Sequence, residues 1–249
     1  DESNNTLTFN ATPLTVIDTT APTVDNVSID SDNAHNSGTS EYATTGDTVM
    51  LTFTADETIG TPTVGFTVNG TPAQNFVQVA NTSGNSWTAA FSLDPSDSDG
   101  VVAFTISFSD LAGNAGIPVT STTDGASVTF DKTAPTVVVT APNGGESWNE
   151  IQSVTWTTTD AQPGLRVIEY STDGGGTWNI LSTSAADTGS YSWDTTGTSD
   201  SSQVRIKVYV TDKAGNGPAA DVSNATFTIG DSTPPTMILS SSTVADGGI

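Results

Sequence analysis

The chain has 249 residues with 28 Asp and Glu, 5 Lys and Arg, one His and no Cys, which gives a formal net charge of −23. This charge disfavours nucleic acid and anionic membranes as partners, because both are themselves negatively charged. The absence of cysteine excludes disulfides and thiol chemistry. No stretch approaches the ~18 apolar residues that a membrane helix needs, so we expect no membrane insertion.

Short runs of alternating apolar and polar residues, separated by turns rich in Gly, Asp and Asn, predict an all-β chain. In the first half the expected strands are residues 24–29, 48–55, 62–68, 74–79, 86–93, 101–108 and 126–130. In the second half they are residues 137–140, 153–159, 167–171, 178–182, 189–193, 203–210 and 225–229. Seven short strands in about 100 residues are typical of an immunoglobulin-like sandwich, so we predict tandem antiparallel Ig-like β-sandwiches in an elongated array.

Two of these strands show which residues face the core. Val102, Phe104, Ile106 and Phe108 share one face of the sixth strand of the first half. In the corresponding strand of the second half, Val204, Ile206, Val208 and Val210 point inward, which leaves Arg205, Lys207 and Tyr209 on the outer face. Asn69-Gly70 predicts a tight hairpin, because both residues tolerate a positive φ.

The pattern Asp-x-Thr-(Ala/Pro)-Pro-Thr occurs three times, at residues 18–23, 131–136 and 231–236, with intervals of 113 and 100 residues. Intervals of this size indicate junctions between sandwich domains. We therefore divide the chain into the last strand of a preceding domain with its linker, two whole sandwiches, and a final segment that starts a following domain or serves as a donor-strand tail. Their bounds are residues 1–20, 21–133, 134–233 and 234–249.

Acidic and amide side chains are expected to gather where the linkers enter the sandwiches. The loops after the second and sixth strands return to the pole at which the chain enters. An offset of 102 residues superposes Asp110-Leu-Ala-Gly-Asn114 on Asp212-Lys-Ala-Gly-Asn216, each directly after its sixth strand. A hard cation such as Ca²⁺ takes oxygen ligands of this kind, so Ca²⁺ is the expected cofactor. In the first half the candidate ligands are Asp18, Asp56, Glu57, Asp110 and Asn114, and in the second half they are Asp131, Asp160, Asp212 and Asn216. The loop before the sixth strand of the first half is expected at the opposite pole, beside the linker that starts at Asp131, and adds Asp97 and Asp99.

Two simpler interpretations of these acids stay open. Asp110 and Asp212 can hydrogen-bond nearby backbone amides, so turn formation alone explains the repeated loop. Acidic loops can also be merely solvated. Asp97-Ser-Asp99-Gly100 does not fit an EF-hand, because the first and last ligand positions would fall on Pro95 and Ile106.

The chain resembles the bacterial Ig-like repeats of giant tandem adhesins and other long surface proteins. The residues that carry this resemblance are Thr48-Val49-Met50-Leu51-Thr52-Phe53, Ala55-Asp56-Glu57, Asp110-Leu111-Ala112-Gly113-Asn114 and Asp131-Lys132-Thr133-Ala134-Pro135. The second half carries residues 141–148 and 189–193, which resemble a related sandwich of cell-wall proteins and secreted enzymes. The resemblance implies a secreted β-sandwich stalk at the cell surface, in some members stiffened by calcium at Asp-rich linkers.

One motif is similar to the Asp-box of sialidase propellers, namely Ser171-x-Asp173-x-Gly175-x-Thr177-Trp178. A propeller needs several copies and far more strands, so we interpret the motif as a clasp of a hairpin turn. His35 is the single imidazole and lies in a polar loop, with no cysteine partner and no Gly-x-Ser-x-Gly motif in the chain. We therefore predict that the chain is not an enzyme.

The sequence thus predicts a non-enzymatic, extracellular structural segment of an adhesin stalk, surface layer or filament, rigidified by calcium at its linkers. Its expected partners are neighbouring Ig-like domains of the same chain or identical subunits. The alternative is a carbohydrate-binding or accessory module of a secreted enzyme, with surface glycans as ligands. That alternative needs two or three exposed tryptophans in line, whereas the alternation around Trp156 and Trp193 favours packing in the core.

Overall fold

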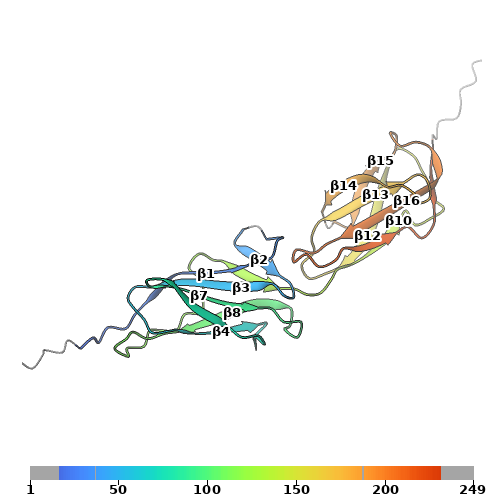
Figure 1. The fold of residues 1–249 in the computed structure, drawn as a ribbon. Helices are drawn as coiled ribbons and strands as arrows, with labels where there is room; N and C mark the ends of the chain where they lie inside the picture. The colour runs from blue at the N-terminus through green and yellow to red at the C-terminus, as the bar shows by residue number, and fades with distance from the viewer. Residues whose placement is uncertain (1–16, 37, 187, 231–249) are drawn as a thin grey trace, which may run out of the picture. The chain divides into compact units, whose positions relative to one another are not determined.

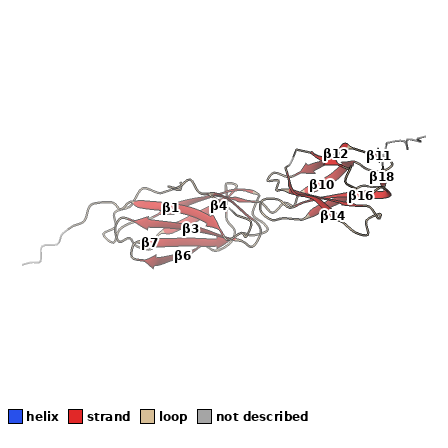
Figure 2. Cartoon of the chain, turned by 90° about the horizontal axis from the view of Figure 1, so that it is seen from above, coloured by secondary structure: helices blue, strands red, loops and turns tan. Residues whose placement is uncertain are grey.

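The computed structural model of the chain describes residues 17–36, 38–186 and 188–230, and these residues form strands and no helix (Figure 2). The chain divides into two compact units, Asp1–Lys132 and Thr133–Ile249. The strands expected within residues 1–16 and 234–249 lie outside the described residues. The all-β prediction is confirmed, and each unit has a hydrophobic core of its own.

The first unit is a sandwich of two sheets (Figure 1). Its strands are β1 (Val24–Ser31), β2 (Ser40–Ala43), β3 (Thr48–Ala55), β4 (Thr63–Val68), β5 (Thr71–Pro72), β6 (Gln78–Ser83), β7 (Ser86–Ser92), β8 (Gly100–Ser107) and β9 (Ser127–Phe130). One sheet has the order β1-β3-β7-β6, and the other has the order β2-β9-β8-β4-β5. Loops after β3 and β8 therefore end at the pole where the linker meets β1.

The core of the first unit follows from the alternation in β3 and β8. Val49, Leu51 and Phe53 of β3 are buried, and so are Val102, Phe104 and Ile106 of β8 with Phe108 beyond its end. Successive side chains of a strand point to opposite faces, so each strand gives one face to the core and one to water. The inward face predicted for β8 is therefore confirmed.

Asn69 and Gly70 form the tight turn that the sequence predicts. Their φ values are 50° and 76°, and the turn joins Val68 of β4 to Thr71 of β5. Positive φ at both central residues is the signature of the turn whose twist matches an antiparallel hairpin.

The second unit repeats the arrangement with its own strands. They are β10 (Thr136–Ala141), β11 (Ser147–Trp148), β12 (Ile151–Thr159), β13 (Arg166–Ser171), β14 (Asn179–Ala185), β15 (Ser190–Asp194), β16 (Ser201–Val210), β17 (Ala219–Val222) and β18 (Phe227–Ile229). One sheet has the order β10-β12-β15. The other has the order β11-β18-β16-β13-β14, with β17 beside β16.

Aromatic rings fill much of the second core. Trp148 lies 5.1 Å from Phe227 and 6.2 Å from Trp193, measured between ring centroids, and Tyr170 lies 4.9 Å from Trp193. Such tilted and edge-on pairs add to the stabilisation that comes from burying the rings. The core position expected for Trp193 is therefore confirmed.

The structure contains strands that the sequence analysis did not predict. In each unit a short strand, β2 or β11, follows the first strand. It belongs to the other sheet and pairs in parallel with the last strand there, β2 with β9 and β11 with β18. Residues Ser40–Ala43 and Ser147–Trp148 are too short to show a hydrophobic period. Only pairing with a neighbouring strand makes them part of a sheet.

One predicted strand lies later in the sequence than expected. Residues 74–79 contain the apolar Phe76 and Val79, but the strand is Gln78–Ser83, and Phe76 is 87% exposed. Strand β6 is at the edge of its sheet, where only β7 fixes its register, from Gln78 opposite Ala90 to Ser83 opposite Ser86. The apolar pattern was therefore a poor guide to this strand.

Because each unit has its own core, we expect truncations at equivalent positions to act on separate unfolding transitions. Phe53 and Trp156, each 2% exposed, occupy the second long strand of their units. Phe53→Ala and Trp156→Ala should each lower the unfolding free energy of their own unit by about 3–5 kcal/mol. Differential scanning calorimetry measures this, and a shift of both transitions by either variant alone would contradict it.

Candidate metal centre at the linker end of the first unit

The loop after β8 is held by the side chain of Asp110. Its Oδ1 accepts a hydrogen bond from the backbone N–H of Asn114 at 2.8 Å, and its Oδ2 accepts one from the Asn114 side-chain amide at 2.6 Å. Burial raises the pKa of Asp110, but the hydrogen bonds from Asn114 and the neighbouring backbone outweigh it, so the pKa lies below its usual value. The turn-forming role considered for this residue is therefore present.

The linker that precedes β1 is bound to the loop after β3. The carboxylate of Asp56 accepts hydrogen bonds from the backbone N–H of Thr23 at 2.8 Å and from its hydroxyl at 2.9 Å. The backbone N–H of Asp56 donates in return to the carbonyl of Thr23 at 3.1 Å. The bonds from Thr23 lower the pKa of Asp56, so this acid anchors the linker as a charged group.

Asn114 ties the same linker to the loop after β8. Its side-chain amide donates to the backbone carbonyl of Asp18 at 3.1 Å in addition to its bond with Asp110. The linker residue Asp18 is thereby brought next to the loop after β8, and its own carboxylate accepts a bond from the backbone of Thr20.

Three carboxylates converge at this pole. One oxygen from each of Asp18, Glu57 and Asp110 lies within 4.8 Å of the other two. Burial and the negative charges of Asp18, Asp110 and Asp56 raise the pKa of Glu57. Three acidic oxygens at this spacing, in three different segments of chain, form a set that a divalent cation could bridge.

Two other predicted ligands of the first unit lie at its opposite pole, as the strand order predicts. Asp97 and Asp99 precede β8, whereas Asp110 follows it, so the two groups are at opposite ends of this strand. The side chain of Asp97 accepts a bond from the backbone of Asp94 at 2.9 Å, and Asp99 accepts one from the backbone of Lys132 at 2.9 Å. The ammonium group of Lys132 in turn donates to the carbonyl oxygens of Pro95 and Asp97.

The second unit contains the same loop. Asp212 accepts bonds from the backbone N–H and the side-chain amide of Asn216, both at 2.7 Å. Asp160 follows β12, accepts a bond from the backbone of Gln162, and has a carboxylate oxygen within 4.8 Å of one of Asp212. Asp131 directly follows β9, and its backbone N–H donates to the carbonyl of Ala43 at 2.8 Å. Asp131 thus occupies the same place in its linker motif as Asp18 does in the first.

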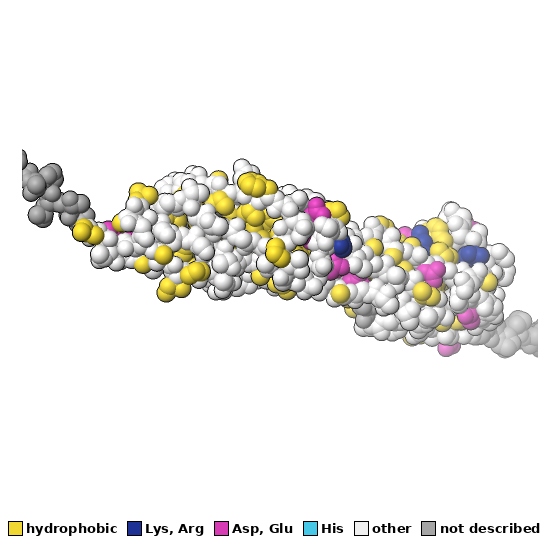
Figure 3. Space-filling model, turned by 90° about the horizontal axis from the view of Figure 1, so that it is seen from below, with side chains coloured by type: hydrophobic (Ala, Val, Ile, Leu, Met, Phe, Trp, Pro, Cys, Tyr) yellow, Lys and Arg dark blue, Asp and Glu magenta, His cyan; other side chains and the backbone are white. Residues whose placement is uncertain are grey.

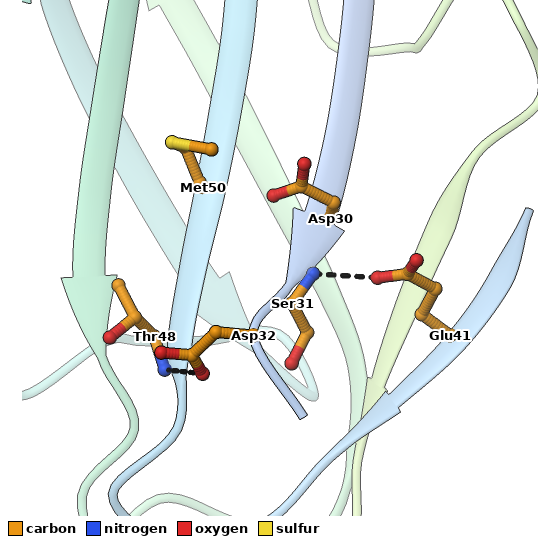
Figure 4. Close-up of a pocket in the computed structure, with 6 residues that line it drawn as sticks. All are labelled: Asp30, Ser31, Asp32, Glu41, Thr48 and Met50. Atoms are coloured by element: carbon orange, nitrogen blue, oxygen red, sulfur yellow. Dashed lines mark hydrogen bonds between the residues drawn. The ribbon is translucent and has the colours of Figure 1, made fainter. Parts of the chain in front are cut away.

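A further acidic group was not predicted as a site. Asp30, Asp32 and Glu41 line a shallow pocket with Met50 (Figure 4). Glu41 accepts a bond from the backbone of Ser31, and Asp32 accepts one from the backbone of Thr48, while Asp30 points toward Met50 without such a bond (Figure 4). Asp30 lies in β1 and Asp32 directly follows it, and their i, i+2 spacing at the end of a predicted strand is the signal that could have revealed this group.

We expect Asp30→Asn to stabilise the first unit at neutral pH. Burial and the charge of Asp32 raise the pKa of Asp30 above 3.8, so the folded state loses stability as pH rises through the region just above that value. The gain should be smaller than the ~4–8 °C that 1 kcal/mol gives a domain of about this size. Thermal melting at pH 7 and pH 3 measures it, with Asp25→Asn as the charge-matched control on the same strand. A gain that persists unchanged at pH 3 would contradict this origin.

The Asp-box segment clasps the hairpin between β13 and β14, as the sequence predicts. The hydroxyl of Ser171 donates to Asp173 at 2.6 Å and accepts a bond from the backbone of Gly175 at 2.8 Å. Asp173 also accepts bonds from the backbone of Thr177 at 2.9 Å and from its hydroxyl at 2.7 Å. The bond from Ser171, followed by those from Thr177, lowers the pKa of Asp173 far below its usual range.

Asp173→Asn should therefore destabilise the second unit in a pH-dependent manner. Because the folded pKa is depressed, the stability from this carboxylate is present above its ordinary pKa of 3.8 and is lost as pH falls below it. The melting temperature of the variant should be lower than that of the wild type at pH 7, and the difference should narrow below pH 3.8. Asp200→Asn, an exposed acid in the same unit, is the control, and an equal loss in both variants would argue against the clasp.

Four of the five tryptophans are buried, namely Trp87, Trp148, Trp156 and Trp193. Trp178 is partly exposed, and the ammonium of Lys207 lies 4.5 Å from its ring centroid. The part of the chain that the structure describes therefore has no line of exposed tryptophan rings. His35 is exposed in its loop.

Comparisons with known proteins do not identify a family for the chain. No family model and no curated protein matches the chain. A three-domain titin fragment is 13% identical over 85% of this chain and 67% of its own length, with a TM-score of 0.48. The mouse nectin-like molecule 4 ectodomain is 16% identical over 87% of this chain and 67% of its own, with a TM-score of 0.34. These superpositions are too loose for an argument, so the Ig-like assignment rests on the strand order within each unit.

The described residues contain no helix with the length and apolar character needed to cross a membrane.

Proposed function

We propose that the chain is a non-enzymatic, extracellular structural segment in which a divalent cation orders the linker where it enters a sandwich. Ca²⁺ is the cation that we propose. The convergence of Asp18, Glu57 and Asp110 within 4.8 Å is the observation that carries this proposal. Among the described residues, no lysine or arginine bonds to any of the three carboxylates. A cation is therefore the group that would relieve their mutual repulsion.

The three acids come from segments that a rigid junction must hold together. Asp18 belongs to the linker, Glu57 to the loop after β3, and Asp110 to the loop after β8. A cation bound to all three would fix the linker to the sandwich, and the bonds that Thr23 and Asn114 already make would preorganise it. Fewer linker conformations then mean a stiffer junction.

The same device is proposed for the second unit, because it has the same loop. Asp212 and Asn216 repeat the bonding of Asp110 and Asn114, and Asp131 stands in the linker motif where Asp18 stands in the first. Repetition of one junction along a chain is how an array of sandwiches would become a stalk, surface layer or filament at the cell surface. Neighbouring Ig-like domains or identical subunits are then the natural partners.

Carbohydrate binding is the weaker candidate for this chain. Stacking on sugar rings needs exposed aromatic faces, whereas four tryptophans are buried and Lys207 lies against the ring of the fifth. No observation among the described residues favours a glycan site over a structural role.

Calcium should raise the melting temperature of the first unit and reduce bending at its linker. At a free concentration a hundredfold above Kd, ligand binding adds about 2.7 kcal/mol to the unfolding free energy. Glu57→Gln should remove most of this gain, yet it should melt slightly higher than the wild type in chelator, because it relieves the repulsion that raises the pKa of Glu57. Calorimetry with Ca²⁺ or EDTA measures the first effect, and small-angle scattering measures the second.

Asp200→Asn provides the matched control, because it removes one charge from an exposed turn of the second unit. It should keep the full calcium response. Identical melting curves and scattering profiles with Ca²⁺ and with EDTA would overturn the proposal.

A further inference from the structure

The outer face of β16 gathers residue types that are scarce in this chain. Arg205, Lys207 and Tyr209 point away from the core of the second unit, as the alternation with the buried Val204, Ile206 and Val208 requires. Pairing of Lys207 with Glu169, and of Glu169 with Ile180, extends this face across β13 to β14. Figure 3 shows dark blue cationic side chains beside yellow hydrophobic ones on the second unit.

Lys207 is held within this face. Its ammonium forms an ion pair with Glu169 and lies 4.5 Å from the ring centroid of Trp178 and 5.6 Å from that of Tyr209. The ammonium of Lys207 is therefore occupied by Glu169 and the two rings, so Lys207 is not the group that a partner would bind.

Arg205 is in a different situation. It has no carboxylate partner among the described residues, although the chain contains 28 acids. Its one hydrogen bond, from Nη1 to the carbonyl of Ser223, is 3.5 Å long, and its buried Nε has no acceptor. The buried Nε is out of reach of a partner, but the only hydrogen bond of the guanidinium within the described residues is the long one from Nη1, so its outer N–H groups keep donors that a carboxylate from outside the chain could accept.

Trp178 lies next to this arginine. A Cβ placed on Gly175 would meet Trp178 at 3.5 Å and Arg205 at 3.9 Å, so both side chains border the same stretch of bare backbone. Ile180, 61% exposed, adds apolar surface on the neighbouring strand. Trp, Tyr and Arg are the residues that contribute most to protein–protein interfaces. This face holds the one tryptophan that is not buried and one of only two arginines in the chain.

We propose that this face binds an acidic loop of a second copy of the chain. The side chains that form it are those of Arg205, Trp178, Ile180 and Tyr209. A planar guanidinium pairs with a carboxylate through two parallel hydrogen bonds, and the surface of a second copy is rich in carboxylates. The other cations are less suited, because Arg166 is fully buried and Lys132 is bonded to the carbonyls of Pro95 and Asp97. A glycan is disfavoured because Lys207 lies over the ring of Trp178.

This contact should depend on salt in a characteristic way. Two chains of net charge −23 repel each other over the Debye length, which is about 30 Å at 0.01 M salt and about 8 Å at 0.15 M. At low salt the whole-chain repulsion dominates, at physiological salt the local pairing of Arg205 with a carboxylate remains, and near 1 M salt that pairing is weakened too. Self-association should therefore be strongest at intermediate salt.

Sedimentation velocity on the full chain, in EDTA and at concentrations up to about 1 mM, would test the proposal at several salt concentrations. EDTA makes the result independent of any bound cation. Arg205→Gln should reduce the association constant at least about tenfold, since a central arginine of an interface typically contributes that much or more. Ile180→Ser, which leaves every charge in place, should weaken association as well.

Lys213→Gln is the control, because it removes the same charge from an exposed position in the loop after β16. It should leave association at the wild-type level, and melting curves should show that each variant is folded. A wild-type chain that stays monomeric at every salt concentration would overturn the proposal. So would an equal loss in Arg205→Gln and Lys213→Gln, or binding of an added acidic polysaccharide such as alginate without any self-association.

Discussion

Repulsion between carboxylates is the constraint on which the rest of this structure depends. A chain of net charge −23 with only five basic side chains cannot neutralise its acids by internal ion pairs. Many acids instead accept hydrogen bonds from backbone N–H groups and nearby hydroxyls, as Asp56 does from Thr23 and Asp173 does from Thr177. These bonds favour the ionised form of the carboxylates and hold the loops and linkers in place.

A carboxylate that lacks such donors needs another group to balance its negative charge. Within the described residues Glu57 faces Asp18 and Asp110 without a hydrogen bond of its own, and burial together with these charges raises its pKa. The opposite case is Arg205, a cation with no carboxylate partner among the described residues. A bound cation would balance the first group, and a carboxylate from outside the chain would balance the second.

The two units satisfy the same scaffold with different cores. The first core contains six phenylalanines and one tryptophan among its aliphatic residues, and the ring centroids of Phe66 and Phe91 are 4.6 Å apart. The second packs tryptophans, among them Trp148 and Trp193, against Phe227. The loops after the long strands β8 and β16 are nevertheless bonded in the same way. The hydrogen-bonded Asp and Asn pair is therefore the same in two units with different cores, because its bonds lie within the loop and do not depend on the core.

Local pattern in the sequence determined the all-β class, the inward faces of β8 and β16, the turn at Asn69-Gly70 and the clasp around Asp173, because each depends on residues a few positions apart. The expected strand order also placed the acids of the linker and of the loops after β3 and β8 at one pole, and Asp97 and Asp99 at the other. Tertiary structure alone decided which of these acids come close: one oxygen from each of Asp18, Glu57 and Asp110 lies within 4.8 Å of the other two, whereas Asp56 bonds to Thr23. It also decided the parallel pairing of β2 with β9, which short segments acquire only from the strand beside them.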